Sequence, residues 1–181
     1  MKKLISVVVL TVFVGTHAIG AMVGKGTREF DIGGMFDETD ELNIRLDVSG
    51  GYYVMDYVEV GAGLGFDWLH DGDDLTIRGG FFGQYDLIHR PVELMPFVGG
   101  GLGIVHTDVR TVNNNNSANR SNSATAAELT GFGGLKYYLL DNLAISTQLD
   151  IMVATDDVYV GSSNKMEAFD WDISLSARFF F

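Results

Sequence analysis

The feature that most constrains the fold is an alternation of apolar and polar residues that recurs along the chain after Gly26. It is clearest near the C-terminus, where Phe169 and Trp171 alternate with Asp170 and Asp172. A period of two residues is typical of a β-strand with two unlike faces. The pattern predicts eight strands, over residues 27–37, 41–53, 57–69, 74–86, 94–107, 127–139, 142–155 and 167–181.

The predicted strands are about 10 to 14 residues long, longer than the 5 or 6 residues usual in soluble sheets. A tilted strand that crosses a bilayer needs about 9–11 residues. Because hydrocarbon leaves no partner for an open strand edge, such strands must close into a barrel. We therefore predict an all-β fold, an eight-stranded antiparallel up-and-down transmembrane β-barrel.

The two faces of the strands differ in bulk, and this difference predicts which face points inward. Eight strands enclose a lumen that side chains only just fill, and the large apolar faces would overfill it. The apolar faces are therefore predicted to face outward. Strand direction then gives two aromatic girdles, with Trp68 and Trp171 at the outer rim and Tyr52, Tyr85 and Tyr137 at the periplasmic rim.

The inward faces carry charges of both signs. We predict a network of ion pairs that plugs the lumen, since a buried charge is costly unless it is paired. A narrow path for cations through an acidic lumen is the alternative. The residues predicted to form the network are Arg45, Arg78, Lys136, Arg178, Asp47, Glu59, Asp150 and Asp172.

The N-terminus has the pattern of a secretory signal peptide. Lys2 and Lys3 precede an apolar run over residues 4–14, which is too short to span a bilayer as a helix. A small-x-small cleavage site ends at Gly20, and an alternative site ends at Ala18. We expect residues 1–20 to be the signal peptide and residues 21–181 to be the barrel domain of the exported protein.

Composition excludes several classes of function. A formal charge of −12 argues against a nucleic-acid partner, which needs a basic surface. The absence of Cys excludes a disulfide scaffold and a thiolate metal site, and no cofactor is expected. Acidic residues gather in the predicted outer loops near 37–41, 71–74 and 156–157. They predict either binding of divalent cations or a solvated rim.

Three segments carry a resemblance to a known group of proteins. They are the C-terminal run from Arg178 to Phe181, the glycine-rich run 96–103, and the run 133–143 around Tyr137. They resemble the small eight-stranded outer-membrane β-barrels, the superfamily that contains the OmpA transmembrane domain and OmpX. This resemblance implies location in the outer membrane, contact with its lipid and lipopolysaccharide, and a structural or surface-interaction role. It also implies that the barrel assembly machinery recognises Phe179 and Phe181.

Some barrels of this superfamily modify lipid A, so catalysis is a further alternative. The hydrolase type uses a His-x-Ser pair together with an acid. Here the residue two positions after His106 is Asp108 instead of Ser, which departs from that pattern. We therefore predict that the protein is not an enzyme, with a lipid A-modifying activity as the second alternative function.

Overall fold

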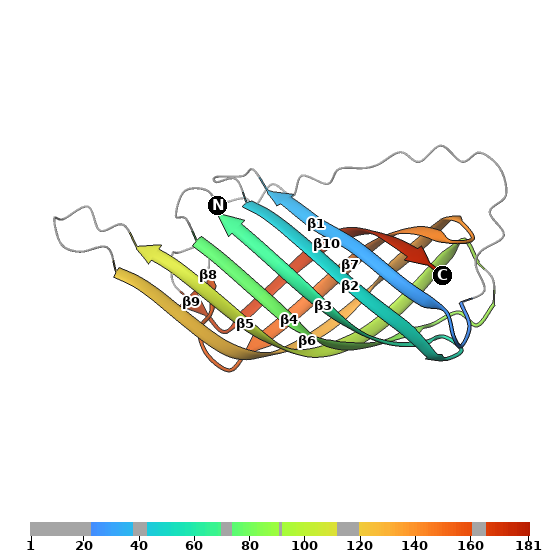
Figure 1. The fold of residues 1–181 in the computed structure, drawn as a ribbon, viewed down its shortest axis with the longest axis horizontal. Coiled ribbons are helices and arrows are strands. Elements are labelled where there is room, and N and C mark those ends of the chain that lie inside the picture. The colour runs from blue at the N-terminus through green and yellow to red at the C-terminus, as the bar shows by residue number, and fades with distance from the viewer. Residues whose placement is uncertain (1–22, 38–42, 70–73, 91, 112–119, 161–165) are drawn as a thin grey trace.

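The computed structural model describes residues 23–37, 43–69, 74–90, 92–111, 120–160 and 166–181, which fold into a closed β-barrel (Figure 1). Eight strands form the barrel wall, and the two shortest strands pair separately as a small hairpin. The strands are β1 (Arg28–Asp37), β2 (Asn43–Met55), β3 (Val58–Leu69), β4 (Asp74–Asp86), β5 (Leu94–Thr111), β6 (Arg120–Leu140), β7 (Leu143–Ala154), β8 (Tyr159–Val160), β9 (Met166–Glu167) and β10 (Phe169–Phe180).

The barrel has the predicted fold class. Every neighbouring pair in the wall is antiparallel, and the order is β1-β10-β7-β6-β5-β4-β3-β2, with β1 and β10 closing the ring. No helix in the described part of the chain has the length and apolarity to cross a membrane. The predicted signal peptide, residues 1–20, and most acidic residues of the first two predicted outer loops lie outside the described residues.

β1 begins and β10 ends on the same side of the barrel, which we call the terminal end. There the amide of Arg28 donates to the carbonyl of Phe181 at 3.0 Å, and the amide of Phe181 donates back at 2.9 Å. The opposite end, which we call the loop end, carries the connection of β1 to β2, of β3 to β4, of β5 to β6 and of β7 to β10. All three connections at the terminal end are shorter than ten residues.

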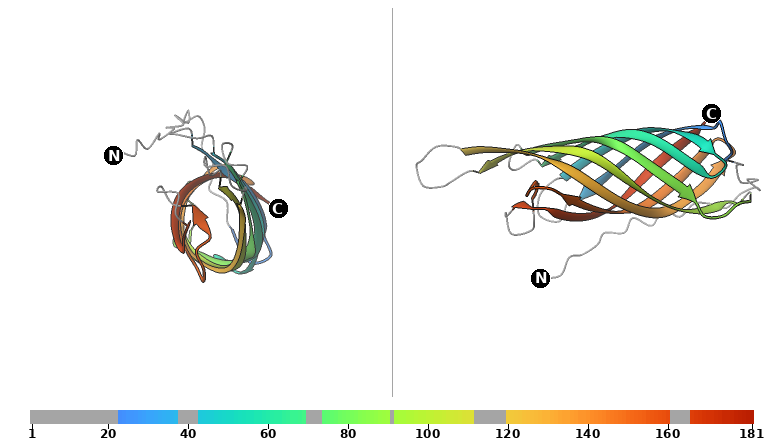
Figure 2. Two further views of the ribbon diagram at one scale, coloured as in Figure 1. Left: turned by 90° about the vertical axis from the view of Figure 1, so that its left-hand side faces the viewer. Right: turned by 90° about the horizontal axis from the view of Figure 1, so that it is seen from below.

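Two hairpins differ from the sequence prediction. β5 and β6 extend to Thr111 and back to Arg120, beyond the predicted bounds of 94–107 and 127–139, because they continue to pair with each other (Figure 2). The extension, residues 108–111 and 120–126, consists mostly of small and polar residues, so it lacks the alternation of large apolar and polar residues from which the other strands were predicted. The hairpin of β8 and β9 was not predicted, since two residues per strand are too few to show a period.

Large apolar side chains cover the outside of the barrel. Phe81 and Leu102 are 76% and 69% exposed. Trp68 and Trp171 lie on this outer face toward the loop end, and Tyr52, Tyr85 and Tyr137 lie at the terminal end. The outside therefore has the surface expected of a barrel in contact with hydrocarbon, with aromatic residues toward both ends.

Aromatic rings also lie inside the barrel, at positions where the neighbouring strand carries glycine. The ring of Phe97 lies over Gly134, where an added Cβ would come within 2.7 Å of the ring. Phe132 lies over Gly99 in the same way, and its ring centroid is 6.3 Å from that of Phe97. Phe82 likewise lies over a glycine of β3. Glycine thus makes room for inward rings in a lumen that is otherwise crowded.

Candidate functional site: the barrel lumen

A fully buried lysine organises the lumen near the terminal end. Lys136, on β6, places its Nζ 3.2 Å from Glu29 Oε2 and 3.2 Å from Asp86 Oδ1. It also donates to the hydroxyl of Tyr53 at 2.8 Å, and that hydroxyl donates to Asp86 Oδ2 at 3.1 Å. The ammonium lies between 5.4 and 5.7 Å from the ring centroids of Tyr53, Phe97 and Phe180. This cation is therefore held by charge, hydrogen bonds and aromatic faces together.

A second buried cation extends this network toward the middle of the barrel. The Nη1 of Arg178 donates to Glu29 Oε1 at 2.7 Å, and its Nε lies 3.0 Å from Asp31 Oδ2. Its other nitrogen contacts include Gln84 Oε1 at 3.0 Å and Gln148 Oε1 at 3.1 Å. Because Arg178 lies on β10 and its partners lie on β1, β4 and β7, it connects opposite walls of the barrel.

Glu59 is the least compensated carboxylate of this end. Its side chain is 1% exposed, and Gln84 Nε2 donates to its Oε2 at 3.1 Å. Its Oε1 has no hydrogen-bond partner among the described residues, and no described Lys or Arg forms an ion pair with it. The sequence predicted Glu59 inside the lumen, but it did not predict a carboxylate without a cation.

Toward the loop end, two arginines share a cluster of aspartates. Arg45 contacts Asp47 at 2.9 Å and forms an ion pair with Asp172. Arg78 forms an ion pair with Asp67, and its Nη1 lies 3.1 Å from the sulfur of Met152. Asp150 lies directly opposite Asp172 in the ladder. It accepts a hydrogen bond from Gln148 at 2.8 Å.

All eight residues that the sequence predicted for the lumen network thus lie inside the barrel, in two groups. Lys136, Arg178 and Glu59 belong to the terminal end, and the other five belong to the loop end. Sequence reasoning did not single out Tyr53. Tyr53 points inward, and the alternation of β2 could have indicated this, because Tyr53 is an even number of residues from Arg45 and Asp47 and the register shift lies after it, between Tyr53 and Met55.

A cavity of about 200 Å³ separates these two groups of charges. Charged side chains from both groups line it, and Phe82, Phe132 and Met152 add apolar surface. The lining charged residues are Asp31, Arg45, Asp47, Arg78, Glu128, Asp150 and Arg178. The described lumen therefore has room for water or a small solute in the middle of the barrel.

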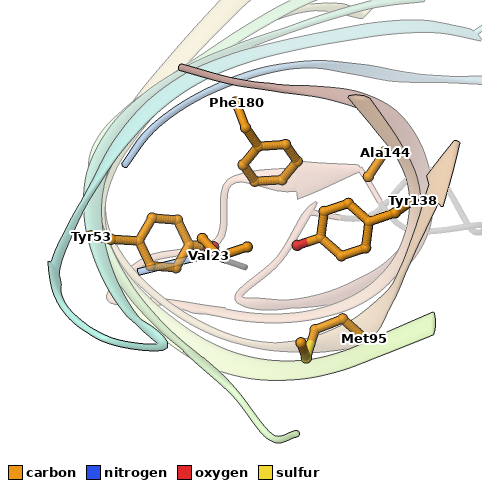
Figure 3. Close-up of a cluster of buried hydrophobic side chains, with 6 residues drawn as sticks. All are labelled: Val23, Tyr53, Met95, Tyr138, Ala144 and Phe180. Carbon is orange, nitrogen blue, oxygen red and sulfur yellow. The ribbon is translucent and has the colours of Figure 1, made fainter. Parts of the chain in front are cut away.

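At the terminal end, an apolar cluster closes the barrel below Lys136. Figure 3 shows Val23 inserted among Tyr53, Met95, Tyr138 and Phe180, together with the smaller Ala144. Each of these side chains is at most 5% exposed. Val23 comes from the segment that precedes β1, so this segment folds under the barrel and completes the seal.

At the loop end, the hairpin of β8 and β9 covers part of the mouth. Val158 and Tyr159 are 1% and 5% exposed, and they pack against Val105, Ala126 and the outer part of β7. The hydroxyl of Tyr159 donates to Glu128 Oε2 at 2.7 Å. Val158 and Tyr159, in the described part of the connection between β7 and β10, therefore fold inward.

The lumen carries many more carboxylates than cations. The four inward cations of the described residues are the three arginines at 45, 78 and 178 and the lysine at 136. The inward carboxylates are Glu29, Asp31, Asp47, Glu59, Asp67, Asp86, Glu128, Asp150, Asp170 and Asp172. Among the described residues, acidic groups are therefore in excess inside the barrel.

The remaining predicted residues occupy less enclosed positions. Phe181 is 77% exposed on the outside of the terminal end, and Phe179 faces the same side. His106 lies on the outside toward the loop end, where its Nδ1 is 2.7 Å from Thr125 Oγ1 and its Nε2 is 3.8 Å from Asp108. Within the described ranges, no group of three or more His, Asp or Glu side chains could hold a metal ion.

No protein-family model and no curated protein sequence matches this chain, but solved structures do. The N-terminal β-barrel domain of OprF from Pseudomonas aeruginosa is 22% identical, covers 87% of this chain and 99% of its own, and has a TM-score of 0.58. Neisserial surface protein A is 14% identical over 86% of this chain and 95% of its own, also with a TM-score of 0.58.

A third similar structure is Ail, the attachment invasion locus protein of Yersinia pestis, solved with the heparin analogue sucrose octasulfate. It is 15% identical, covers 87% of this chain and 99% of its own, and has a TM-score of 0.54. At these identities the likeness concerns the fold. The closed antiparallel wall, the outward apolar belt and the charged lumen agree with that likeness, and the protein has the fold of the small eight-stranded outer-membrane β-barrels.

Proposed function

We propose that the protein is an integral outer-membrane β-barrel with a closed lumen, and that its role is structural or surface-interacting. The observation that carries the membrane location is the outward face, where aromatic and aliphatic side chains stand exposed on all eight wall strands. An apolar surface of this extent is unstable in water and stable in hydrocarbon. The terminal end then faces the periplasm, and the loop end faces the exterior.

The proposal of a closed lumen is supported by the buried side chains at the terminal end. Lys136, Tyr53 and Tyr138 are fully buried, and Val23 and Phe180 seal the mouth beneath them. A hydrated ion would have to displace both an apolar seal and a set of ion pairs to pass. Eight-stranded barrels are narrow enough for side chains to fill, which agrees with a stable plug.

Two measurements test the location and the closure. The membrane fraction is compared on gels in SDS before and after boiling, and the refolded protein is inserted into planar bilayers. We expect a heat-dependent shift in the outer-membrane fraction and no steady conductance. A soluble periplasmic protein without a shift would refute the membrane location. Steady conductance would refute the closed lumen.

A narrow cation-selective channel is the second candidate, and the excess of inward carboxylates favours it. In that case, single-channel steps would be cation-selective. They would change when Asp150, which lines the central cavity, is replaced by alanine. Arg78→Ala, at the same cavity, removes a positive charge and serves as the matched variant of opposite sign. Currents that respond to neither variant would argue against conduction through this lumen.

We further propose that the protein has no catalytic activity. The exposed group of His106, Thr125 and Asp108 has a distance of 3.8 Å between imidazole and carboxylate, too long for the hydrogen bond that orients a catalytic base. Mass spectrometry of lipid A from cells that express the wild type or His106→Ala tests this proposal. A mass difference between the two would refute it.

A further inference from the structure

The central cavity of the lumen is lined by two ionic side chains whose hydrogen-bonding capacity the barrel leaves partly unused. Its volume is about 200 Å³, which is below the roughly 300–1,000 Å³ of pockets for drug-sized ligands. A ligand of this cavity is therefore a small solute. Because buried side chains close the terminal end, such a solute enters from the loop end.

Arg78 is the lining cation with unused donors. A guanidinium has five N–H donors and no acceptor. The Nη2 of Arg78 serves the ion pair with Asp67, and its Nη1 donates to the sulfur of Met152 at 3.1 Å. A thioether sulfur is only a weak acceptor, and the Nε of Arg78 has no hydrogen-bond partner in the described part of the chain. This side chain can therefore still bind an anionic group.

Asp150, on β7, is a lining carboxylate without a cation. Its side chain is 7% exposed, and its Oδ1 accepts a hydrogen bond from Gln148 at 2.8 Å. No Lys or Arg whose side chain the structure describes forms an ion pair with it. Asp172 lies directly opposite on β10, and its Oδ1 is buried without a hydrogen-bond partner among the described residues. Because like charges at such positions repel each other, a positive group beside Asp150 reduces an existing repulsion.

The two unsatisfied groups lie close to each other across the cavity. Arg78 extends from β4 as far as Met152, which is two residues from Asp150 on the inward face of β7. Residues with this spacing lie about 6–7 Å apart along a strand. Within the described lumen, Arg78 and Asp150 form no ion pair with each other, although both line the cavity. A ligand that satisfies both must carry opposite charges separated by only a few bonds.

We propose that the central cavity binds a small zwitterion, with its carboxylate at Arg78 and an alkylated ammonium group beside Asp150. Hydrogen bonds between a guanidinium and a carboxylate are charge-assisted and strong. Phe82, Phe132 and Met152 add aromatic and apolar surface to the cavity, and such surface suits the alkyl groups of a quaternary ammonium. A simple cation leaves the donors of Arg78 unused, and a simple anion leaves Asp150 without a cation.

The test uses the protein refolded in nanodiscs of phosphatidylethanolamine and phosphatidylglycerol, with glycine betaine as the probe. Choline and acetate are the matched ligands, because each carries one of the two charges alone. Saturation-transfer NMR of the ligand methyl protons gives the dissociation constants, and empty nanodiscs give the background. Asp150→Asn removes the negative charge and keeps an oxygen that accepts from Gln148, whereas Arg78→Met removes the guanidinium. Asp157→Asn, at an exposed position that does not line the cavity, is the control.

We expect glycine betaine to bind at least tenfold more tightly than choline or acetate. Asp150→Asn and Arg78→Met should each weaken its binding at least tenfold, and Asp157→Asn should leave it unchanged. A heat-dependent gel shift shows that each variant has folded, and Asp150→Asn alone decides the outcome if Arg78→Met does not fold.

Three results overturn the proposal. Choline that binds as tightly as glycine betaine indicates a site for cations only, and acetate that does so indicates a site for anions only. No saturation transfer to glycine betaine at tens of millimolar, or full binding by Asp150→Asn, means that the cavity holds water. Cell fractionation tests the membrane location separately from these outcomes.

Discussion

Replacing Lys136 by methionine tests whether the buried network holds the barrel together. At an effective dielectric constant of about 20, each of its two carboxylate contacts at 3.2 Å represents an attraction of about 5 kcal/mol. Desolvation of each ion offsets several kcal/mol of that attraction. Methionine keeps the approximate length and the apolar stem of the side chain and removes the ammonium group. The variant therefore reports the ion pairs together with the hydrogen bond to Tyr53.

Of the two carboxylates that Lys136 contacts, one loses more stabilisation than the other. Glu29 keeps its contact with Arg178 at 2.7 Å, whereas Asp86, which is 0% exposed, keeps only the neutral donors Tyr53 and Gln84. Removing one partner of a buried ion pair costs about 3–5 kcal/mol. We therefore expect Lys136→Met to lower the free energy of unfolding by about that amount.

The assay is equilibrium unfolding in guanidinium chloride of the barrel refolded into lipid vesicles, followed by tryptophan fluorescence. Adding Asp86→Asn to Lys136→Met removes the unpaired charge and should restore at least half of the loss. Lys25→Met, at an exposed lysine outside the lumen, is the control and should change stability by less than about 0.5 kcal/mol. A loss below about 1 kcal/mol, or no recovery in the double variant, would refute the reasoning.

Four further outcomes are expected. Gly99→Val should lower the free energy of unfolding in the same assay by about 1–3 kcal/mol, because its side chain would overlap the ring of Phe132. Gly131→Ala, where a Cβ meets no atom within 4 Å, should have little effect. Tyr159→Phe should speed amide exchange in the hairpin of β8 and β9, because it removes the hydrogen bond from the tyrosine hydroxyl to Glu128 of β6. Deleting Phe181 should reduce the amount of assembled, heat-modifiable barrel in the outer-membrane fraction. Unchanged amounts would contradict its predicted role as an assembly signal.

The sequence was sufficient to predict the number of wall strands and the face that each turns outward. Both follow from the period of two, which is a local property of each strand. Phe66 and Trp68 alternate with Gly65 and Asp67, and these four residues show the two faces of β3 before any partner strand is known. The volume of the side chains then indicated which face points inward, since a narrow lumen accommodates glycine and aspartate more readily than rows of large rings.

The partners inside the lumen could not be predicted in the same way. Lys136 and Glu29 are 107 residues apart and lie on β6 and β1, which are not neighbours in the sheet. Their contact depends on how far each strand is displaced along its neighbours around the whole ring. Alternation within one strand contains no information about that displacement. The sequence could therefore predict which charges point inward and could not predict which of them meet.

The inward glycines show how the same limit applies to packing. When each strand is considered alone, Gly99 and Gly134 indicate only a low strand propensity or local flexibility. The register gives them a different meaning, because Gly99 lies beside Phe132 and Gly134 beside Phe97 across the β5–β6 pair. Each ring occupies the space that a Cβ would take, so the small and the large residue form one unit. The lumen can thus hold the rings of Phe82, Phe97 and Phe132 beside two ion-pair groups and a cavity, because each of these three rings lies opposite a glycine on the adjacent strand.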